Sequence, residues 1–176
     1  MTIEELREYN KGRRIFQIGI VVKDIDESVK KWTEEYKVGP WTILTHSNEF
    51  LQDSMNKPEA ADAEWRFTIG LAMIGDVQIE LIAPEYGIPL YEEFLERCGD
   101  GSIHHFKEIM PDDEMNAQIE YYESKGAEMV FGGNFYGARF AYPRTKELFG
   151  TQIELGNGMP AQTPETYTLR RMYPEE

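Results

Sequence analysis

Short runs of alternating hydrophobic and polar residues make up most of the chain, and two stretches with helical spacing interrupt them. The first run, Ile15 to Val22, predicts a strand. In the next stretch, Glu27 to Lys37, hydrophobic residues recur every three or four positions, which predicts a helix with Asp26 as N-cap and Gly39-Pro40 as stop. Three further strands are predicted, over 41–45, 65–73 and 77–82.

The same order of elements recurs in the second half. Ile103 to Met110 predicts a strand, and Pro111 opens a predicted helix that runs to Lys125 and stops at Gly126. Strands are then predicted over 128–131, 135–142 and 151–155, and Gly132-Gly133-Asn134 together with Gly137 predicts a hairpin turn. The tetrapeptide Gln-Ile-Glu-Leu closes both halves, at 78–81 and 152–155. We therefore predict an α+β protein in which two tandem β-α-β-β-β modules form a curved mixed sheet around one cleft, with the helices outside.

Turn residues set the predicted borders of these modules. The predicted parts are an N-terminal extension (1–14), a first module (15–84), a linker with a short helix at 90–97 (85–101), a second module (102–157) and a C-terminal tail (158–176). The polar stretch 46–64 predicts a long loop that could cover a site. The tail is expected either to pack on a partner or to be mobile.

The composition narrows the class of protein. Lys and Arg total 18 against 32 for Asp and Glu, so the formal net charge is −14. Nucleic acids and anionic membranes attract basic surfaces, so this charge argues against both as partners. Cys98 is the only cysteine, which excludes an intramolecular disulfide and a cysteine-based metal site. Neither a membrane span nor the apolar segment of a secretory signal is present, so we expect a soluble, cytoplasmic protein.

Four polar residues occupy equivalent strand positions in the two modules. Aligning the repeats places Gln17 against His105 and Glu80 against Glu154, so one imidazole nitrogen and three oxygens face the same side of the sheet. Such a set suits Zn²⁺, Ni²⁺, Co²⁺, Mn²⁺ or Fe²⁺. Spacing alone leaves a second interpretation open, in which His105 is a buried core residue and both glutamates are solvated.

Three other candidates lie nearby. By strand alternation His104 points away from His105, which predicts a structural or exposed side chain. His46 lies in the predicted loop and is expected to face solvent rather than a substrate. Lys107 shares the face of His105, which would put a cation near the metal.

At these residues the sequence resembles the vicinal-oxygen-chelate superfamily, which comprises glyoxalase I, methylmalonyl-CoA epimerase, extradiol dioxygenases and bleomycin-resistance proteins. The resemblance covers Ile15 to Asn157. Its motifs are Gln17-Ile-Gly-Ile-Val-Val-Lys-Asp, Glu80-Leu-Ile-Ala-Pro, Gly101-Ser-Ile-His-His-Phe and Gly150-Thr-Gln-Ile-Glu154-Leu. The family's metal ligands match Gln17, Glu80, His105 and Glu154, and this set looks like that of glyoxalase I. The epimerase pattern has His and Gln at the positions of Gln17 and Glu80, and extradiol enzymes use two histidines and one glutamate.

The resemblance implies a divalent-metal-dependent lyase or isomerase of the glyoxalase type, which removes a proton α to a carbonyl through a metal-stabilised enediolate. It implies Glu154 as the leading candidate for the base and Glu80 as the alternative. It also implies a small-molecule substrate and a homodimer.

Two alternatives remain open: a methylmalonyl-CoA epimerase-like enzyme and a non-catalytic small-molecule-binding protein. Epimerases of the family use a further glutamate on a strand of the first module. Near the matching place this chain has Thr68 and Gly70 instead of a glutamate. A substrate with carboxylates, such as a glutathione adduct, would need cationic contacts, for which the candidates are Arg13, Arg14, Arg66 and Arg139.

Overall fold

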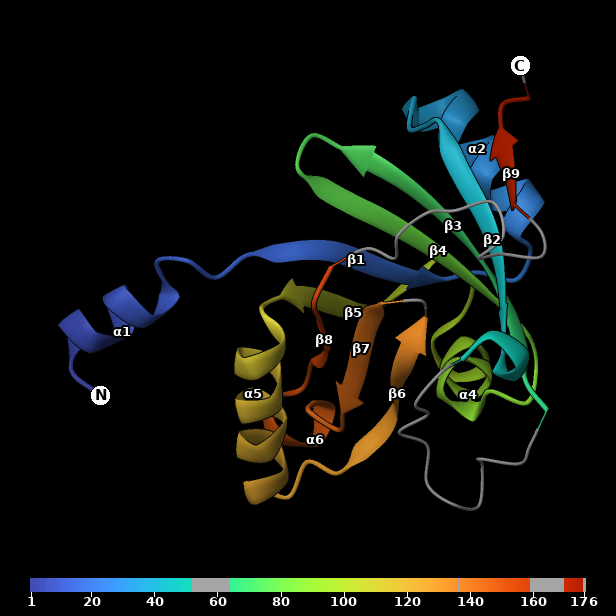
Figure 1. The fold of residues 1–176 in the computed structure, drawn as a ribbon. Coiled ribbons are helices and arrows are strands. Elements are labelled where there is room, and N and C mark those ends of the chain that lie inside the picture. The colour runs from blue at the N-terminus through green and yellow to red at the C-terminus, as the bar shows by residue number, and fades with distance from the viewer. Residues whose placement is uncertain (52–63, 136, 159–169, 176) are drawn as a thin grey trace.

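The strands form one strongly curled mixed sheet (Figure 1). The structure is a computed structural model that describes residues 1–51, 64–135, 137–158 and 170–175. Within these residues the strand order is β6-β7-β8-β5-β1-β4-β3-β2-β9. This confirms the predicted α+β class with a curved mixed sheet.

The first module consists of β1 (Ile15–Val21), α2 (Ile25–Tyr36), β2 (Trp41–Ser47), β3 (Arg66–Ile74) and β4 (Val77–Tyr86). β4 runs parallel to β1, and β3 and β2 follow as antiparallel neighbours. Asp24 caps α2 by accepting a hydrogen bond from the backbone N–H of Glu27, so the prediction of Asp26 as the N-cap was wrong.

The second module repeats this arrangement with β5 (Ser102–Ile109), α5 (Asp112–Ser124), β6 (Met129–Phe135), β7 (Ala138–Pro143) and β8 (Gln152–Gly156). A short helix, α6 (Lys146–Phe149), precedes β8. β6 and β7 form the predicted hairpin, but β6 continues through 132–134 and the turn lies at Gly137, which has a positive φ of 96°.

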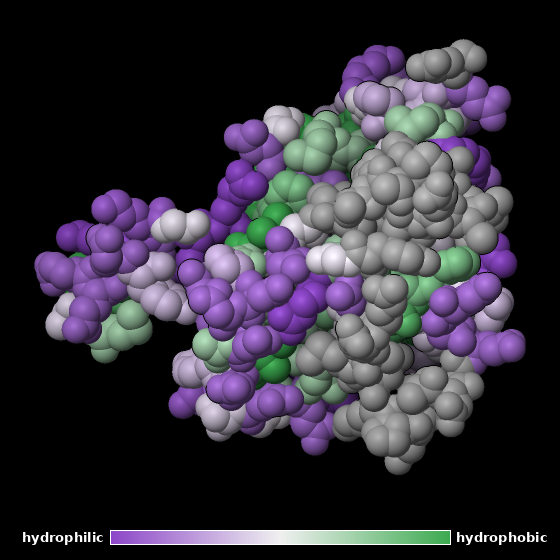
Figure 2. Space-filling view, viewed as in Figure 1, coloured by the Kyte–Doolittle hydropathy of each residue, from purple (hydrophilic) through white to green (hydrophobic). Residues whose placement is uncertain are grey.

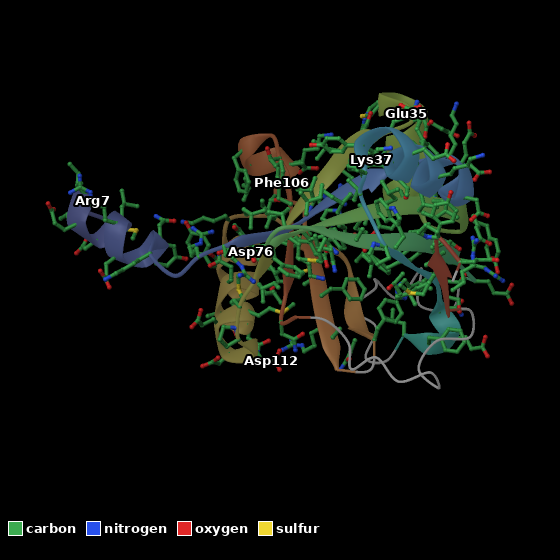
Figure 3. All side chains as sticks on the ribbon, turned by 90° about the horizontal axis from the view of Figure 1, so that it is seen from above. Arg7, Glu35, Lys37, Asp76, Phe106 and Asp112 are labelled. Atoms are coloured by element: carbon green, nitrogen blue, oxygen red, sulfur yellow. The ribbon has the colours of Figure 1, made fainter. Side chains whose placement is uncertain are left out.

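Three segments form structure that the pattern did not predict. α1 (Ile3–Asn10) has no buried residue and extends away from the sheet, as the position of Arg7 shows (Figure 3). A one-turn 3-10 helix, η1 (Asn48–Phe50), follows β2, so the predicted loop begins later than residue 46; residues 52–63 lie outside the described part. In the tail, β9 (Arg170–Tyr173) adds to the sheet beside β2.

Helices cover the sheet and divide the core into three clusters. α2 buries Val29 against β3 and β4, and α5 buries Met115 against β7 and β8. α4 (Pro89–Cys98), which links the modules, contacts β1, β4 and β5 and places Tyr91 and Phe94 in a third cluster with residues of both halves. Hydrophilic residues predominate on the face shown in Figure 2, in keeping with the net charge. None of the helices among the described residues has the length and apolar character needed to cross a bilayer.

Candidate metal centre

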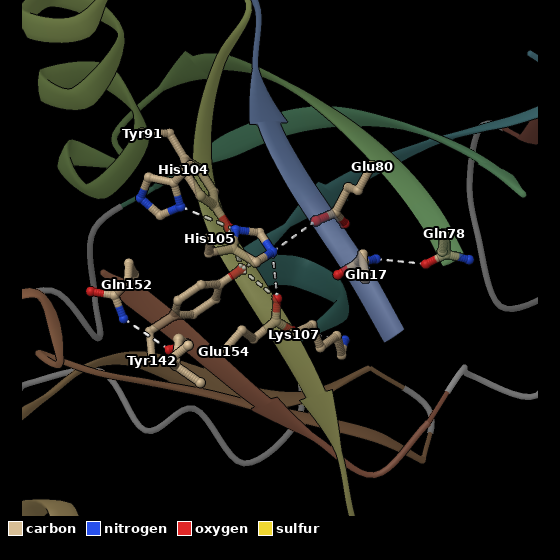
Figure 4. A network of polar contacts seen from close by, with 11 residues as sticks. Gln17, Gln78, Glu80, Tyr91, His104, His105, Lys107, Tyr142, Gln152 and Glu154 are labelled. Carbon is tan, nitrogen blue, oxygen red and sulfur yellow. Dashed lines mark hydrogen bonds and ion pairs between the residues drawn. The ribbon is translucent and has the colours of Figure 1, made fainter. Parts of the chain in front are cut away.

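The candidate site lies where the inner strands of the two modules meet. β1 and β5 are antiparallel neighbours, β4 flanks β1, and β8 flanks β5. Gly19 of β1 is paired with Glu80 on one side and with His105 on the other. Lys107 of β5 is paired with Glu154. The register therefore brings polar side chains from four strands to one place, as Figure 4 shows.

The strand register agrees with the repeat seen in the sequence. Gln17 is paired with Gln78 in the first module, and His105 with Gln152 in the second. Two residues further along these strands, Gly19 and Lys107 occupy equivalent positions. The two modules thus present the same framework with different side chains, glutamine and glycine in one and histidine and lysine in the other.

Glu80, His105 and Glu154 form a group whose potential ligand atoms all lie within 4.8 Å of one another. His105 Nε2 is 2.9 Å from Glu154 Oε2 and 3.4 Å from Glu80 Oε2. His105 is fully buried, and the side chains of Glu80 and Glu154 are 13% and 5% exposed. The interpretation of two solvated glutamates is therefore wrong, because both carboxylates are aimed at the buried imidazole.

Gly19 leaves the space that the His105 ring occupies. A Cβ at position 19 would lie 2.5 Å from His105 Nε2 and still closer to Cε1 and Nδ1 of the same ring. Gly19 does not have a positive φ, so the requirement for glycine comes from this close approach and not from the backbone conformation.

Gln17 is held in place by Gln78. Its Nε2 donates a hydrogen bond to Gln78 Oε1 at 2.6 Å, while its own Oε1 is buried and has no hydrogen-bond partner among the described residues. A buried oxygen without a hydrogen bond is costly and therefore rare, unless an ion or a water molecule satisfies it. One amide oxygen, one imidazole nitrogen and two carboxylates, with no sulfur, fit a divalent cation such as Zn²⁺, Ni²⁺ or Mn²⁺.

The carboxylate of Glu154 is surrounded by donors. Tyr142 Oη donates to its Oε2 at 2.7 Å, and Lys107 Nζ lies 2.7 Å from its Oε1. Tyr91 of α4 in turn donates to the Tyr142 hydroxyl at 3.2 Å. These contacts, together with that of His105, fix both oxygens of Glu154.

Burial and charge act in opposite directions on the two central groups. Burial alone would lower the pKa of His105, but hydrogen bonds and negative charge from Glu154 and Glu80 raise it to about 9. Burial alone would raise the pKa of Glu154, but the charge of Lys107 and the hydrogen bond from His105 lower it to about 2. In the protein without a cation, His105 is therefore an imidazolium between two carboxylates.

A mostly apolar cavity of about 570 Å³, including the part open to solvent, borders this group. Gln17, Glu80, Lys107 and Glu154 line it together with Tyr91 and Tyr142. The remaining wall is apolar and largely aromatic, and it includes Leu44, Phe67, Ile69, Leu71, Phe131, Phe135, Ala138 and Phe140.

Of the two other histidines, His46 differs from its predicted placement, whereas His104 fits one of the two placements predicted for it. His46 was expected to face solvent, but it belongs to β2, is 6% exposed and packs in the cavity wall between Phe67 and Phe135. Burial is the main cause that lowers the pKa of His46 to about 3, and the positive charge of Lys107 adds to it, so the His46 imidazole is neutral. His104 is buried against Tyr91 and Phe94, as expected for a structural side chain, and its Nδ1 lies 3.1 Å from Nδ1 of His105.

None of the four arginines considered as contacts for carboxylates is among the described residues that line the cavity. Arg13 forms a two-pronged ion pair with buried Glu108, which explains the polar residue at that strand position. Arg66 pairs with Glu85, Arg139 with Asp112, and the Arg14 guanidinium lies over the Phe16 ring.

Sequence reasoning missed Gln78, Tyr91 and Tyr142. Gln78 and Gln152 occupy the same place in the repeated tetrapeptide but have different partners. Gln78 accepts a hydrogen bond from Gln17, whereas Gln152 donates one to the backbone carbonyl of Pro143. The repeat therefore gave no indication that Gln78 holds Gln17. Tyr142 lies two residues after Phe140 on β7, so the two side chains point to the same face of the strand, and both line the cavity. This alternation is the sequence feature that could have identified Tyr142. Tyr91 comes from the linker helix, and no local pattern connects it to the site.

Comparison with known proteins gives matches at the level of family and fold. A family model described as the glyoxalase/bleomycin resistance protein/dioxygenase superfamily matches residues 16–142. No curated protein sequence matches the chain.

Solved structures with the same fold share about one residue in five with this chain. A hypothetical protein from Bacillus halodurans C-125 is 19% identical with a TM-score of 0.58, over 86% of this chain and 99% of its own. Methylmalonyl-CoA epimerase from Mycobacterium tuberculosis is 20% identical with a TM-score of 0.56, over 82% and 87% of the two chains. A Streptomyces coelicolor methylmalonyl-CoA epimerase variant in complex with 2-nitronate-propionyl-CoA is 19% identical with a TM-score of 0.59, over 86% and 98%.

Proposed function

The chain belongs to the glyoxalase/bleomycin resistance protein/dioxygenase superfamily, and we propose that it is a divalent-metal-dependent lyase or isomerase of the glyoxalase type. In this proposal it moves a proton at the carbon next to a carbonyl group of a small molecule. The observation that supports it most directly is the convergence of Glu80, His105 and Glu154 within 4.8 Å at the wall of an apolar cavity.

Four residues would hold the cation: Gln17 through its Oε1, which has no partner among the described residues, His105 through Nε2, and Glu80 and Glu154 through their carboxylates. A bound divalent cation would supply Lewis-acid polarisation of the substrate carbonyl. The apolar wall lowers the polarity around the carboxylates, which strengthens the electrostatic interactions made beside it.

The contacts of the two glutamates favour different roles for them. Glu154 accepts from Tyr142, Lys107 and His105, and a carboxylate with three donors is a weak base. Glu80 is more exposed, and its contact with His105 is the longer one, at 3.4 Å. We therefore propose Glu80 as the group that takes the proton and Glu154 as a fixed ligand, which reverses the order that the resemblance implied.

Epimerisation is the second candidate, because the similar solved structures include methylmalonyl-CoA epimerases. Inversion calls for proton transfer on both faces of the substrate carbon. Thr68 and Gly70 do not line the cavity: Thr68 donates to Glu85, and a Cβ on Gly70 would meet Val29. The residues of β3 that do line it are apolar, which favours transfer by the carboxylates beside the cation.

The test is exchange of the substrate α-proton in D₂O, followed by NMR, with a panel of 2-oxo thiohemiacetals and acyl-CoA esters and with metal content measured in parallel. Glu80→Gln should lower the exchange rate about 10²–10⁴-fold while metal stays bound. Glu154→Gln should lower it less. Glu85→Gln is the matched control, because Glu85 lies on the same strand but pairs with Arg66 outside the cavity.

The outcomes separate the candidate functions. Exchange lost in Glu154→Gln but kept in Glu80→Gln would return the role of base to Glu154. Inversion of an acyl-CoA ester would favour the epimerase. Bound metal with no exchange for any substrate would favour the binding protein. The homodimer and the cytoplasmic location remain predictions, and light scattering tests the first.

A further inference from the structure

Lys107 is the side chain by which the second module departs most from the first. Its equivalent in the first module is Gly19, yet Lys107 extends a full side chain into the site and is only 11% exposed. The structure makes room for it at Gly156 of β8, where an added Cβ would lie 2.5 Å from Lys107 Cε. The lysine therefore has a dedicated place in the packing of the site.

The ammonium group of Lys107 stands directly beside the proposed cation position. Its Nζ lies 2.7 Å from Oε1 of Glu154, whose other oxygen lies 2.9 Å from His105 Nε2, so a single carboxylate separates the ammonium from the imidazole. An ammonium has three donors, and among the described residues Glu154 is the one hydrogen-bonding partner of Nζ. Two N–H groups remain for an occupant of the cavity that Lys107 lines.

The charges around the cavity do not cancel once a divalent cation is bound. Glu80 and Glu154 contribute −2, Lys107 contributes +1 and the cation contributes +2, which leaves +1. His46, Tyr91 and Tyr142, the other titratable side chains that line the described cavity, are all buried and uncharged. Without Lys107 the same site would be neutral.

A net charge beside an apolar wall is unfavourable unless the ligand compensates it. Building on the proposed metal-dependent function, we infer that Lys107 determines specificity by binding an anionic oxygen of the substrate, and that the substrate is a 2-oxo carboxylate with an apolar body. The carboxylate neutralises the excess charge, and the apolar body packs on the aromatic wall that includes Phe67, Phe135 and Phe140.

The test uses benzoylformate, an aromatic 2-oxo acid with no carbon-bound proton next to its carbonyl groups, and its neutral methyl ester. Because no proton transfer occurs on these compounds, calorimetric titration of the Zn²⁺-loaded protein measures binding alone. The wild-type protein should bind the acid at least about tenfold more tightly than the ester. Lys107→Met should bring the two affinities to within about threefold by weakening binding of the acid only.

Gly156→Ala provides a second variant in which the lysine is kept but pushed from its place, and it should reduce the preference for the acid by an intermediate factor. Zn²⁺ binding is measured for every variant. An unchanged preference in Lys107→Met with Zn²⁺ bound overturns the role of Lys107 and leaves the proposed function intact. Failure of the wild-type protein to bind either probe, with Zn²⁺ bound, overturns the substrate class. Absence of Zn²⁺ from the wild-type protein overturns the proposed function itself, and the inference with it.

Discussion

Replacing Gly19 by alanine places one extra carbon atom where the His105 ring lies. The new Cβ would be 2.5 Å from His105 Nε2, whereas non-bonded atoms of this size settle at roughly 3.5–4 Å. The ring is fully buried and therefore has to move by about 1 Å or more against its neighbours. Ligand distances in metal sites hold to within about 0.2 Å, so such a shift removes the imidazole as a ligand.

The size of the effect follows from this overlap. Overpacking by one methyl group costs about 1–3 kcal/mol of unfolding free energy. At about 2–4 °C per kcal/mol for a chain of this size, Tm should fall by about 2–12 °C. Removing a residue that only hydrogen-bonds to a metal ligand weakens metal binding about 10–100-fold. Displacing the ligand His105 itself should weaken metal binding by at least this factor.

Isothermal titration with Zn²⁺ and thermal unfolding of the metal-free protein measure both effects. Gly70→Ala is the matched control, because Gly70 also lies in a strand and its added Cβ would be 3.0 Å from Val29 Cγ1, outside the cavity. This control should lose stability but bind Zn²⁺ as the wild-type protein does. Wild-type affinity in Gly19→Ala would refute the reasoning, since His105 would then not be a ligand in the orientation observed.

Three further predictions concern His105 and the groups around it. His105→Ala should lower the metal content at least about tenfold, measured by elemental analysis after dialysis, and unchanged stoichiometry would place the metal elsewhere. His105 has a pKa of about 9 without metal and must lose its proton to bind a cation. The apparent affinity for Zn²⁺ should therefore rise about tenfold per pH unit between about pH 7 and 9 and stay constant at higher pH. Competition with a chelator measures this affinity, and an affinity independent of pH would contradict the prediction. Arg13→Ala leaves the buried carboxylate of Glu108 without its ion pair and should lower the free energy of unfolding, measured in urea, by about 1–3 kcal/mol. The loss is smaller than for a fully buried pair because the Arg13 side chain is 39% exposed. A change below about 0.5 kcal/mol would show that water replaces the arginine.

The local pattern of the sequence was sufficient for most elements of the two modules. Helical spacing identifies α2 and α5, because each helix buries one face and exposes the other. Short runs rich in apolar residues identify β1 and β5, which lie in the middle of the sheet and are largely buried on both faces. The same reasoning failed for α1, which buries no residue, and for β9, which is four residues long and follows a stretch outside the described residues. α1 carries Ile3, Leu6 and Tyr9 at three-residue steps but buries none of them, and β9 is too short to show a period.

The sequence by itself pointed to the four candidate metal ligands. The repeat of Gln-Ile-Glu-Leu and the alignment of the two modules were enough to select Gln17, Glu80, His105 and Glu154, because equivalent strand positions in a repeated unit point to the same side of a sheet. Only the tertiary structure decided how these residues differ in chemistry. The antiparallel pairing of β1 with β5 sets Gly19 opposite His105, and the linker helix brings Tyr91 to the hydroxyl of Tyr142. Periodicity encodes the face on which a side chain lies, but not which distant strand or helix becomes its neighbour. That choice depends on long-range packing, and it supplies the donors that tie down Glu154 and leave Glu80 more accessible.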